Sequence, residues 1–315
     1  MKKTAWVPAL AVVIYTAMLL FSDAGSVGEA VSSMKTAMVP LFLGLSLVSY
    51  FFRFLKWWYF LERVGVRVPV RESLGIFLAG FSMTVSPGKL GELLKCYMLK
   101  RRRGIPVSRT SPVVVMERVT DLLSMMIIAL AGLVMTGHRS AFAAVVAGGG
   151  MTAIIIVFLA WEPAFRLLER ILLKIRFFRS RRDGLENFRV HCSGLLDISS
   201  LAVSVPLGVL AWGTEAMILC LVSVSLGVEP GLPVGAALLA HSSGTIAGAV
   251  SMIPGGLGLT EVTIGAILGS YMSGPDATAV TLLMRFATLW FAVALGAVVF
   301  AFVRKGEVRD GSVVK

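Results

Sequence analysis

Long hydrophobic runs separated by short polar links occupy most of the chain, and this alternation predicts the fold. Runs of about twenty apolar residues are long enough to cross a bilayer as helices, and six of them lie near 5–21, 36–60, 112–135, 141–161, 199–226 and 277–303. The first run follows Met1-Lys2-Lys3 as in a signal peptide, but residues 22–25 (SDAG) are a poor cleavage site, so we expect a span there. The pattern predicts an all-α polytopic membrane protein with about six transmembrane helices.

Two further hydrophobic stretches each contain a proline-glycine break. Residues 87–92 read PGKLGE and residues 254–258 read PGGLG, with Glu261 shortly behind. A Pro-Gly pair ends a helix and glycine permits unusual backbone angles, so each stretch predicts two short helices joined at a tip. Such backbone is tolerated at membrane depth only where protein buries it or it lines a wet cavity. We therefore expect two re-entrant helical hairpins, with the tip residues Pro87, Gly88, Gly91, Pro254, Gly255, Gly256 and Gly258.

The order of these elements indicates an inverted repeat. Three predicted spans separate the two hairpins, and an odd number means that the hairpins enter from opposite faces. The same shift along the chain carries Pro87 onto Pro254 and Arg118 onto Arg285. We expect a single membrane domain over 1–315, with a first repeat half at 1–136 and a second at 141–303 that includes a basic interfacial segment at 163–190. This is the architecture of many secondary transporters.

The composition agrees with a membrane protein, and the charge pattern predicts an orientation. Apolar residues make up 57% of the 315 residues and charged residues 15%, while the net charge is +12. Of the 30 basic residues, only Lys35 and Arg139 fall in the predicted outer links, and positive charge marks cytoplasmic links. We expect a multi-pass protein of the plasma (inner) membrane with both termini cytoplasmic. Because the basic residues follow this rule, we expect no nucleic-acid partner.

The basic segment at 163–190 also carries a hydrophobic stripe at helical spacing, formed by Phe165, Leu168, Leu172, Ile175 and Phe178. A helix with one apolar and one basic face lies flat in the headgroup region of a bilayer. Contact with anionic lipid is the favoured role of this segment, ahead of a specific substrate site.

Charged side chains inside the predicted membrane segments are the candidate functional residues. Each costs roughly 3 kcal/mol to insert, so each needs a partner or a purpose. The set is Lys89, Glu92, Lys95, Glu117, Arg118, Asp121, Glu215, Glu261 and Arg285. Arg53, which precedes Lys56 and the aromatic residues 57–59, is instead expected to reach the headgroups with its long side chain.

The roles of these charges stay open between structure and binding. The return helix of each hairpin begins just after the tip glycines, and free N–H groups at a helix N-terminus favour an anion. Glu92 and Glu261 are either first-turn acids favoured by the helix dipole, or they hold the two arginines until a phosphate displaces them. Lys89 adds a cation at the first tip.

The remaining candidates have alternatives of the same kind. Glu117, Arg118 and Asp121 form either an ion-pair cluster at a span end or part of a binding site, and Arg285 needs Glu261, Glu215 or a ligand anion as its partner. Glu215 lies in the middle of a span with no cation near it in sequence, which makes it the best candidate for protonation. His241, beside two serines on an apolar helix, is interpreted as a hydrogen-bonded packing residue ahead of a proton relay.

An ordered set of motifs spans nearly the whole chain: PGKLGE at 87–92, Lys95, Glu117-Arg118 with Asp121, PGGLGLTE at 254–261, and Arg285. Together they resemble the flippase-like membrane region of lysylphosphatidylglycerol synthases, the multiple peptide resistance factor group. The resemblance implies a lipid-translocating fold with two re-entrant hairpins from opposite sides. Full-length members carry a cytosolic aminoacyl-transferase domain, whereas this chain ends about a dozen residues after its last predicted span. We therefore expect a stand-alone member, for which the resemblance does not imply synthesis of lysyl-lipid.

The sequence favours a lipid flippase that moves an anionic or phosphate-containing lipid by alternating access between the hairpins. Its expected partner is a membrane lipid with an anionic headgroup, and a second copy of the chain is a further candidate. No GxxxxGK[S/T] loop is present, so a gradient or the membrane potential would drive movement. One alternative is a membrane-embedded lipid-modifying enzyme, which three scattered histidines and three cysteines do not indicate. The other is a non-transporting partner subunit. We expect no enzymatic activity, cofactor or metal.

Overall fold

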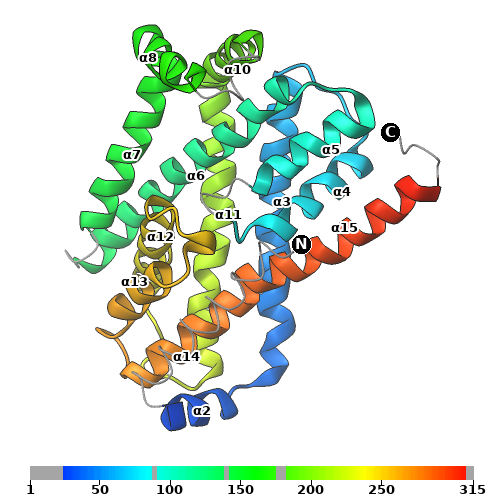
Figure 1. The fold of residues 1–315 in the computed structure, drawn as a ribbon. Helices are drawn as coiled ribbons and strands as arrows, with labels where there is room; N and C mark the ends of the chain where they lie inside the picture. The colour runs from blue at the N-terminus through cyan, green and yellow to red at the C-terminus, as the bar shows by residue number, and fades with distance from the viewer. Residues whose placement is uncertain (1–23, 87–90, 138–141, 175–181, 310–315) are drawn as a thin grey trace.

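The computed structural model describes residues 24–86, 91–137, 142–174 and 182–309, and every element that it assigns there is helical (Figure 1). In chain order the α-helices are α2 (Ala24–Ser32), α3 (Val39–Arg63), α4 (Val70–Gly80), α5 (Leu94–Arg103), α6 (Val107–Thr136), α7 (Phe142–Ala160), α8 (Glu162–Leu173), α10 (Arg182–Leu195), α11 (Ile198–Ser225), α12 (Val234–Val250), α13 (Leu259–Leu268), α14 (Gly274–Arg285) and α15 (Phe291–Arg309). Short helical turns lie at η1 (Thr36–Met38), η2 (Phe81–Met83) and η5 (Pro254–Gly256), and a π-helical turn, η6 (Phe286–Trp290), joins α14 to α15.

Four helical stretches among the described residues are long and apolar enough to cross a membrane, and one bent pair is a fifth candidate. They are Thr36–Arg63, Val107–Thr136, Ile198–Ser225, Gly274–Arg304, and the pair Val145–Ala160 with Glu162–Ile171, which is bent by 91°. These stretches match the predicted spans from 36 onwards. The span predicted at 5–21 lies outside the described residues. The chain is therefore a helical, multi-pass membrane protein.

Two local expectations were wrong. The span predicted from residue 112 begins at Val107, because Pro106 has an extended ψ of 139° that starts the helix there, and Pro112 is accommodated inside α6. The stretch 24–35, expected to be a polar link, contains helix α2, which buries Val27 and packs against α14. An apolar contact of this kind stabilises a short helix that its own propensity would not.

The second predicted hairpin has the expected form. Helix α12 leads to the turn η5, and α13 returns from Leu259 to pack against α12. Gly255, Gly256 and Gly258 have φ angles of 63°, 66° and 89°, a region in which residues with a Cβ are strained. A Cβ on Gly256 would also lie 2.5 Å from the Thr260 hydroxyl oxygen. The glycines of this tip are therefore required by the turn.

The first predicted hairpin is described on both sides of its tip. Helix α4 continues through η2 to Ser86, and the return arm reaches α5. Pro87, Gly88, Lys89 and Leu90 lie outside the described residues. Gly91 is placed where a Cβ would lie 2.5 Å from the Met83 carbonyl oxygen, and its N–H donates to the Ser86 hydroxyl at 2.7 Å. The two arms therefore approach each other closely beside the tip.

The two helix pairs lie in different parts of the bundle. Figure 1 places α4 and α5 near the end of the molecule that carries α8 and α10, and places α12 and α13 towards the end that carries α2. Helix α12 packs against α6, α7, α11 and α13, while α4 packs against α15 and α3. Two hydrophobic clusters lie between these helices. One is formed around Trp57, Phe60 and Phe77, and the other lies between α11, α12 and α14.

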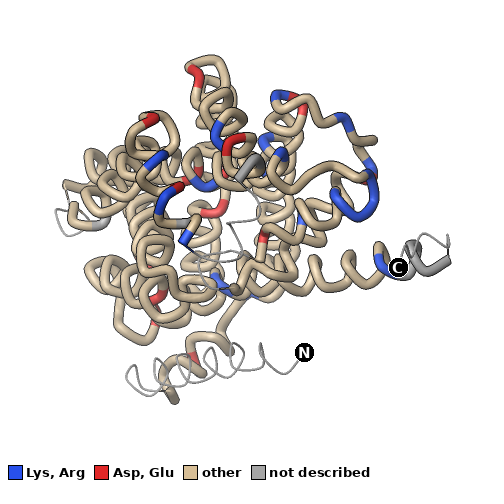
Figure 2. Tube along the Cα trace, turned by 45° about the horizontal axis from the view of Figure 1, so that its top comes forward, with Lys and Arg blue, Asp and Glu red and all other residues tan. Residues whose placement is uncertain are grey.

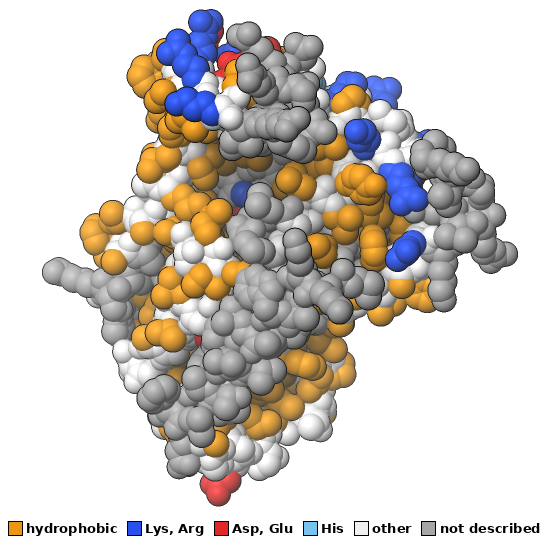
Figure 3. Space-filling view, viewed as in Figure 1, with side chains coloured by type: hydrophobic (Ala, Val, Ile, Leu, Met, Phe, Trp, Pro, Cys, Tyr) orange, Lys and Arg blue, Asp and Glu red, His pale blue; other side chains and the backbone are white. Residues whose placement is uncertain are grey.

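The outer surface separates charge from apolar area. Figure 2 shows Lys and Arg along the chain at the end that carries α8 and α10, and shows acidic and basic residues together inside the bundle. Figure 3 shows a mostly hydrophobic surface below this end, with a recess that holds a basic side chain. Helices α8 and α10 contact each other where the Arg189 guanidinium lies 5.9 Å from the Phe165 ring centroid. Ile175 and Phe178 of the stripe predicted there lie outside the described residues, and the position of this segment at the headgroups stays a prediction.

Candidate functional site

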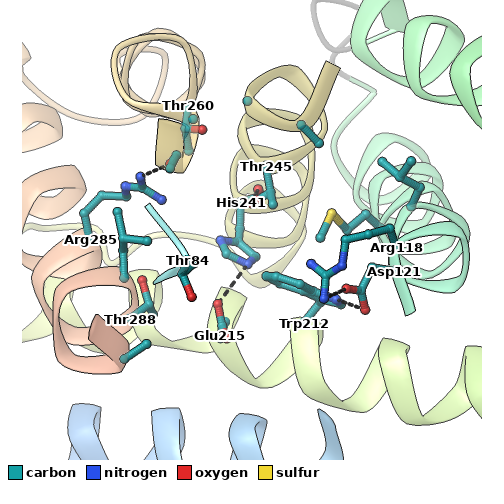
Figure 4. A pocket seen from close by; sticks show the side chains of 18 of the residues that line it. Thr84, Arg118, Asp121, Trp212, Glu215, His241, Thr245, Thr260, Arg285 and Thr288 are labelled. Carbon is teal, nitrogen blue, oxygen red and sulfur yellow. Dashed lines mark hydrogen bonds and ion pairs between the residues drawn. The ribbon is translucent and has the colours of Figure 1, made fainter. Parts of the chain in front are cut away.

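A cavity of about 150 Å³ lies between α3, α6, α11, α12, α14 and the second hairpin tip. Its ionisable lining residues are Tyr50, Arg53, Arg118, Asp121, Glu215, His241 and Arg285. In Figure 4, Arg285 and Arg118 lie on opposite sides of the cavity, with His241 and Glu215 between them. Threonines from four segments add hydroxyl groups to the wall: Thr84, Thr245, Thr260 and Thr288. The cavity therefore brings charged and hydroxyl groups together inside a hydrophobic bundle.

Arg118 is held by two carboxylates on one side of this cavity. Its Nη2 lies 3.2 Å from Glu92 Oε2 and 3.1 Å from Asp121 Oδ2. Its side chain is 22% exposed, and its Nε has no hydrogen-bond partner among the described residues. A guanidinium has five N–H donors in a fork that matches carboxylate and phosphate. Arg118 therefore keeps donor capacity for a further anion.

Asp121 is shared with a cation that the sequence analysis did not select. The Lys56 ammonium pairs with Asp121 Oδ1, and Trp212 Nε1 donates to the same oxygen at 2.9 Å. Lys56 is 1% exposed, although its position beside aromatic residues resembled a membrane interface. Arg53, expected at the headgroups, is also buried and lines the cavity, so that prediction was wrong.

A polar stripe on α3 could have identified Arg53 and Lys56 as buried residues from the sequence. The residues Ser46, Ser49, Arg53 and Lys56 recur at helical spacing inside an otherwise apolar span, and all four are buried. Residues three or four apart lie on one face of a helix, so this stripe predicts a polar contact inside the bundle. A lysine or arginine that reaches the headgroups would instead have to lie on a helix face that is turned to lipid.

Behind Arg118 lies a second ion pair. Lys95 Nζ is 2.6 Å from Glu117 Oε2 and 3.7 Å from Glu92 Oε2. The same ammonium lies 4.3 Å from the Trp57 ring centroid. Gly80 makes room for this side chain, since a Cβ there would lie 2.7 Å from Lys95 Cγ. Glu92, Lys95 and Glu117 are not among the residues that line the cavity, so they support Arg118 from behind.

Arg285, on the other side, is bound to the second hairpin. Its Nε donates to Glu261 Oε1 at 2.7 Å, and its Nη2 donates to the Gly255 carbonyl oxygen at 2.6 Å. Glu261 Oε2 accepts from the Gly258 N–H at 2.7 Å, so the carboxylate also caps α13. Glu261 is one of the partners proposed for Arg285 from the sequence. The pair joins α14 to the hairpin tip.

Glu215 lies between the two arginines. The Ser49 hydroxyl donates to its Oε1 at 2.7 Å, and Arg53 Nη1 lies 3.9 Å from the same oxygen. His241 Nε2 lies 3.9 Å from its Oε2. Neither ring nitrogen of His241 has a hydrogen-bond partner among the described residues, so the predicted hydrogen-bonded packing role does not describe His241.

The structure thus places Arg118, Asp121, Glu215 and Arg285 on the cavity wall, and ion pairs connect four further predicted site residues to Arg118 or Arg285. Glu92, Lys95, Glu117, Arg118 and Asp121 form one connected group, Glu261 and Arg285 form another, and Glu215 lies between the groups. Lys89 lies outside the described residues. No three His, Cys, Asp or Glu side chains in the described part of the chain are arranged to hold a metal ion.

Known proteins are similar in sequence to most of this chain. The model of the lysylphosphatidylglycerol synthase TM region matches residues 8–296. A UPF0104 membrane protein of Methanothermobacter thermautotrophicus is 24% identical over 324 residues, which cover 96% of this chain and 94% of that protein. Glycosyltransferase AglD of Haloferax volcanii is 25% identical over 298 residues, covering 80% of this chain and 46% of AglD. With the family model matched over residues 8–296, this chain belongs to the family of the lysylphosphatidylglycerol synthase transmembrane region.

Proposed function

We propose that this protein is a lipid flippase that moves a lipid with an anionic or phosphate-containing headgroup across the plasma (inner) membrane. The headgroup enters the cavity and contacts Arg118 while the acyl chains stay in lipid. Family membership supports this proposal, because the matched region is the membrane part of a lipid-modifying enzyme family. The protein acts without chemistry on its cargo and without a cofactor.

The observation that carries the proposal is the placement of the two arginines. Arg118 and Arg285 hold equivalent positions in the two predicted halves, and both line one cavity from opposite sides (Figure 4). Buried cations that are balanced by carboxylates are costly unless they serve a purpose. An anion held between these arginines contacts both halves of the molecule at once, which is what alternating access requires.

The proposed fold has six spans and two re-entrant hairpins in an inverted repeat. Figure 1 supports it, because the α4/α5 pair and the α12/α13 pair lie towards opposite ends of the molecule. The end with α8, α10 and the tail of α5 is rich in Lys and Arg, so we assign it to the cytoplasm with both chain termini. Rocking of the halves would then open the cavity to each side in turn.

Two other functions have less support. The relative named as a glycosyltransferase matches over less than half of its own length, so its printed activity is not transferred to this chain. A non-transporting subunit, or a homo-oligomer of such subunits, gives no reason for a cavity lined by three arginines. We therefore favour movement of lipid over chemistry or recruitment.

The test is lipid movement in proteoliposomes. Vesicles of phosphatidylcholine with a trace of fluorescent phosphatidylglycerol or fluorescent phosphatidylcholine report movement when an external reductant quenches the label. We expect wild type to move phosphatidylglycerol and Arg118→Ala to move it at least about tenfold more slowly, since one charge-assisted contact contributes 1.5–3 kcal/mol. The matched control is Arg67→Ala, which removes an exposed arginine from the link between α3 and α4.

Three outcomes of this experiment are informative. Faster movement of phosphatidylglycerol that falls in Arg118→Ala and not in Arg67→Ala supports the proposed function. Equal rates for Arg118→Ala and wild type would remove the headgroup site from this cavity. No movement above empty vesicles, for several headgroups, would leave a recruiting subunit as the better hypothesis.

A further inference from the structure

Three side chains on the cavity wall have polar atoms without a hydrogen-bond partner. Neither ring nitrogen of His241, nor the Thr84 hydroxyl, nor Arg118 Nε makes a hydrogen bond among the described residues. His241 is 2% exposed and Thr84 is 8% exposed, and all three residues line the cavity (Figure 4). A buried polar group without a hydrogen bond is costly, so these atoms favour a polar ligand inside the cavity.

His241 belongs to α12, the arm that leads to the second hairpin tip. Its ring lies beside Trp212, with the two ring centroids 6.0 Å apart. Its Nε2 lies 3.9 Å from Glu215 Oε2, which is longer than a hydrogen bond. A neutral imidazole has one donor nitrogen and one acceptor nitrogen. A ligand that satisfies both nitrogens must therefore accept one hydrogen bond and donate another.

Thr84 brings the first hairpin to the same cavity. It directly follows η2 and lies three residues before the tip residue Pro87, and its hydroxyl can donate one hydrogen bond and accept two. Thr245 and Thr288 donate to carbonyl oxygens one turn earlier in the chain, at 2.8 Å and 2.9 Å, so their hydroxyl oxygens keep acceptor capacity. The wall therefore offers both donors and acceptors to a ligand.

A hydroxyl group is the chemical match for this wall, because it donates and accepts at once. An ionised phosphate only accepts hydrogen bonds and an ammonium only donates them, so each leaves one nitrogen of His241 unmatched. The trimethylammonium group of choline does neither. The Arg118 guanidinium is in turn the match for a phosphate. A phosphate at Arg118 with hydroxyls at His241 and Thr84 describes one headgroup.

We propose that the cavity recognises a polyol headgroup, with Arg118 bound to the phosphodiester and with His241 and Thr84 bound to hydroxyls of the alcohol beyond it. The substrate class is a phospholipid whose headgroup alcohol carries free hydroxyls, such as glycerol, inositol or a sugar. This inference rests on the proposed lipid transport and gives that transport its specificity. Because Thr84 belongs to the first hairpin and His241 to the second, the hydroxyls join the two hairpins around the headgroup.

The experiment compares two lipids that differ in their hydroxyls alone. Phosphatidylpropanol has the same phosphodiester, the same charge and the same three-carbon alcohol as phosphatidylglycerol, but no free hydroxyl. Both lipids carry the fluorescent label on an acyl chain, and their movement is measured in the proteoliposomes described above. In wild type we expect phosphatidylglycerol to move at least about tenfold faster, because a site that hydrogen-bonds a hydroxyl discriminates strongly against an analogue without it.

Two shape-conserving variants test the residues. Thr84→Val removes the hydroxyl, and His241→Phe removes both nitrogens and keeps a ring. Each is expected to slow phosphatidylglycerol by about threefold to tenfold, as the loss of one neutral hydrogen bond predicts, and to leave phosphatidylpropanol unchanged. The ratio of the two rates then falls towards one, whereas structural damage would slow both lipids alike.

Conservative variants and distant controls complete this set. Thr84→Ser keeps the hydroxyl and His241→Gln keeps one donor and one acceptor group, so both are expected to keep the preference for phosphatidylglycerol. Thr263→Val on α13 and His191→Phe on α10 make the same chemical changes at residues that do not line the cavity. Both controls are expected to behave as wild type.

Binding to the wild type in detergent needs no variant. By calorimetry, dihexanoyl-phosphatidylglycerol is expected to bind at least about tenfold more tightly than dihexanoyl-phosphatidylpropanol. Glycerophosphoglycerol carries the same headgroup without acyl chains and is expected to bind more weakly than the lipid. Binding of this free headgroup as tight as that of the lipid would overturn the assignment of the site to a lipid.

The outcomes distinguish this inference from the proposed function. A preference for phosphatidylglycerol that is lost in Thr84→Val and His241→Phe, and kept in Thr84→Ser and His241→Gln, supports the inference. Equal movement of the two lipids in wild type, or an unchanged preference in both shape-conserving variants, overturns the inference and leaves lipid transport standing. No movement of either lipid overturns both.

Discussion

Arg118 and Arg285 occupy equivalent positions in the proposed repeat, yet their surroundings differ. Arg118 contacts the side chains of Glu92 and Asp121, is 22% exposed, and has an Nε without a partner among the described residues. Arg285 is 10% exposed and donates to Glu261 and to the backbone of Gly255. Arg118 is bound by side chains alone, whereas Arg285 is bound to the backbone of the second hairpin tip.

Two arginines at matching positions of the proposed repeat therefore differ in what they bind. An ion pair between side chains can rearrange when a ligand arrives, whereas a bond to a backbone carbonyl at a turn fixes the turn itself. Under the proposed function, Arg118 is therefore the better candidate for the headgroup contact, and Arg285 is the better candidate for a structural role at the hairpin tip. The predictions below test this division.

The largest expected effect is on stability. Arg285→Ala leaves Glu261, which is fully buried, without its cation, and breaking a buried pair in this way costs about 3–5 kcal/mol. Arg118→Ala is expected to cost less, because Asp121 keeps Lys56 and Glu92 keeps Lys95. Unfolding by sodium dodecyl sulfate in mixed micelles measures both free energies.

A conservative double variant controls for that result. Arg285→Met with Glu261→Gln removes both charges and is expected to recover part of the lost stability, because no buried charge is left unpaired. Equal losses for Arg118→Ala and Arg285→Ala would contradict the division of roles.

A smaller effect is expected from Lys56→Met. Asp121 then keeps Arg118 and the Trp212 N–H as its partners, and the loss of one charged hydrogen bond lowers stability by about 1.5–3 kcal/mol. Without Lys56, Asp121 binds Arg118 more tightly, so a headgroup must break a stronger ion pair to reach Arg118. Movement of phosphatidylglycerol is expected to slow about tenfold for each 1.4 kcal/mol by which the Arg118–Asp121 pair is strengthened. The proteoliposome assay measures that rate.

The matched control for this variant is Lys35→Met, which replaces an exposed lysine in the link before η1. It is expected to change neither stability nor rate. Unchanged movement in Lys56→Met would show that the hold of Asp121 on Arg118 does not limit lipid binding.

The smallest effect is expected at an exposed pair, which sets a baseline for the buried ones. Asp197 accepts hydrogen bonds from Ser199 and Ser200 and lies 2.6 Å from Arg63 Nη2. The Ser199 and Ser200 bonds, with some help from Arg63, lower the pKa of Asp197 below its ordinary value. A carboxyl with a lowered pKa stabilises the fold above its unfolded pKa, about 3.9, and that contribution is lost as the pH falls further.

Asp197→Asn is therefore expected to have a slightly lower melting temperature than wild type at pH 6. The difference between the two melting temperatures is expected to shrink as the pH falls below 4. Thermal unfolding in detergent across this range measures the gap. A gap that stays constant with pH would assign the effect to the lost helix cap instead of the charge.

The sequence by itself determined the features that depend on neighbouring residues. Hydropathy located the described spans, because a bilayer requires a fixed apolar length. The Pro-Gly pair and the three glycines with positive φ located the second tip, because those backbone angles exclude side chains. Glu261 was among the partners named for Arg285, since the hairpin and the next helix are adjacent in the chain.

Only the tertiary structure decided which distant charges meet. Lys56 pairs with Asp121 from another helix, and Glu215 gains Arg53 and His241 as neighbours from α3 and α12. No local pattern fixes such contacts, because they depend on how each helix rotates about its axis when its polar stripe packs inward. In a bilayer the rotation of each helix is set by the burial of its polar groups among the other helices. The cavity forms where these polar faces meet.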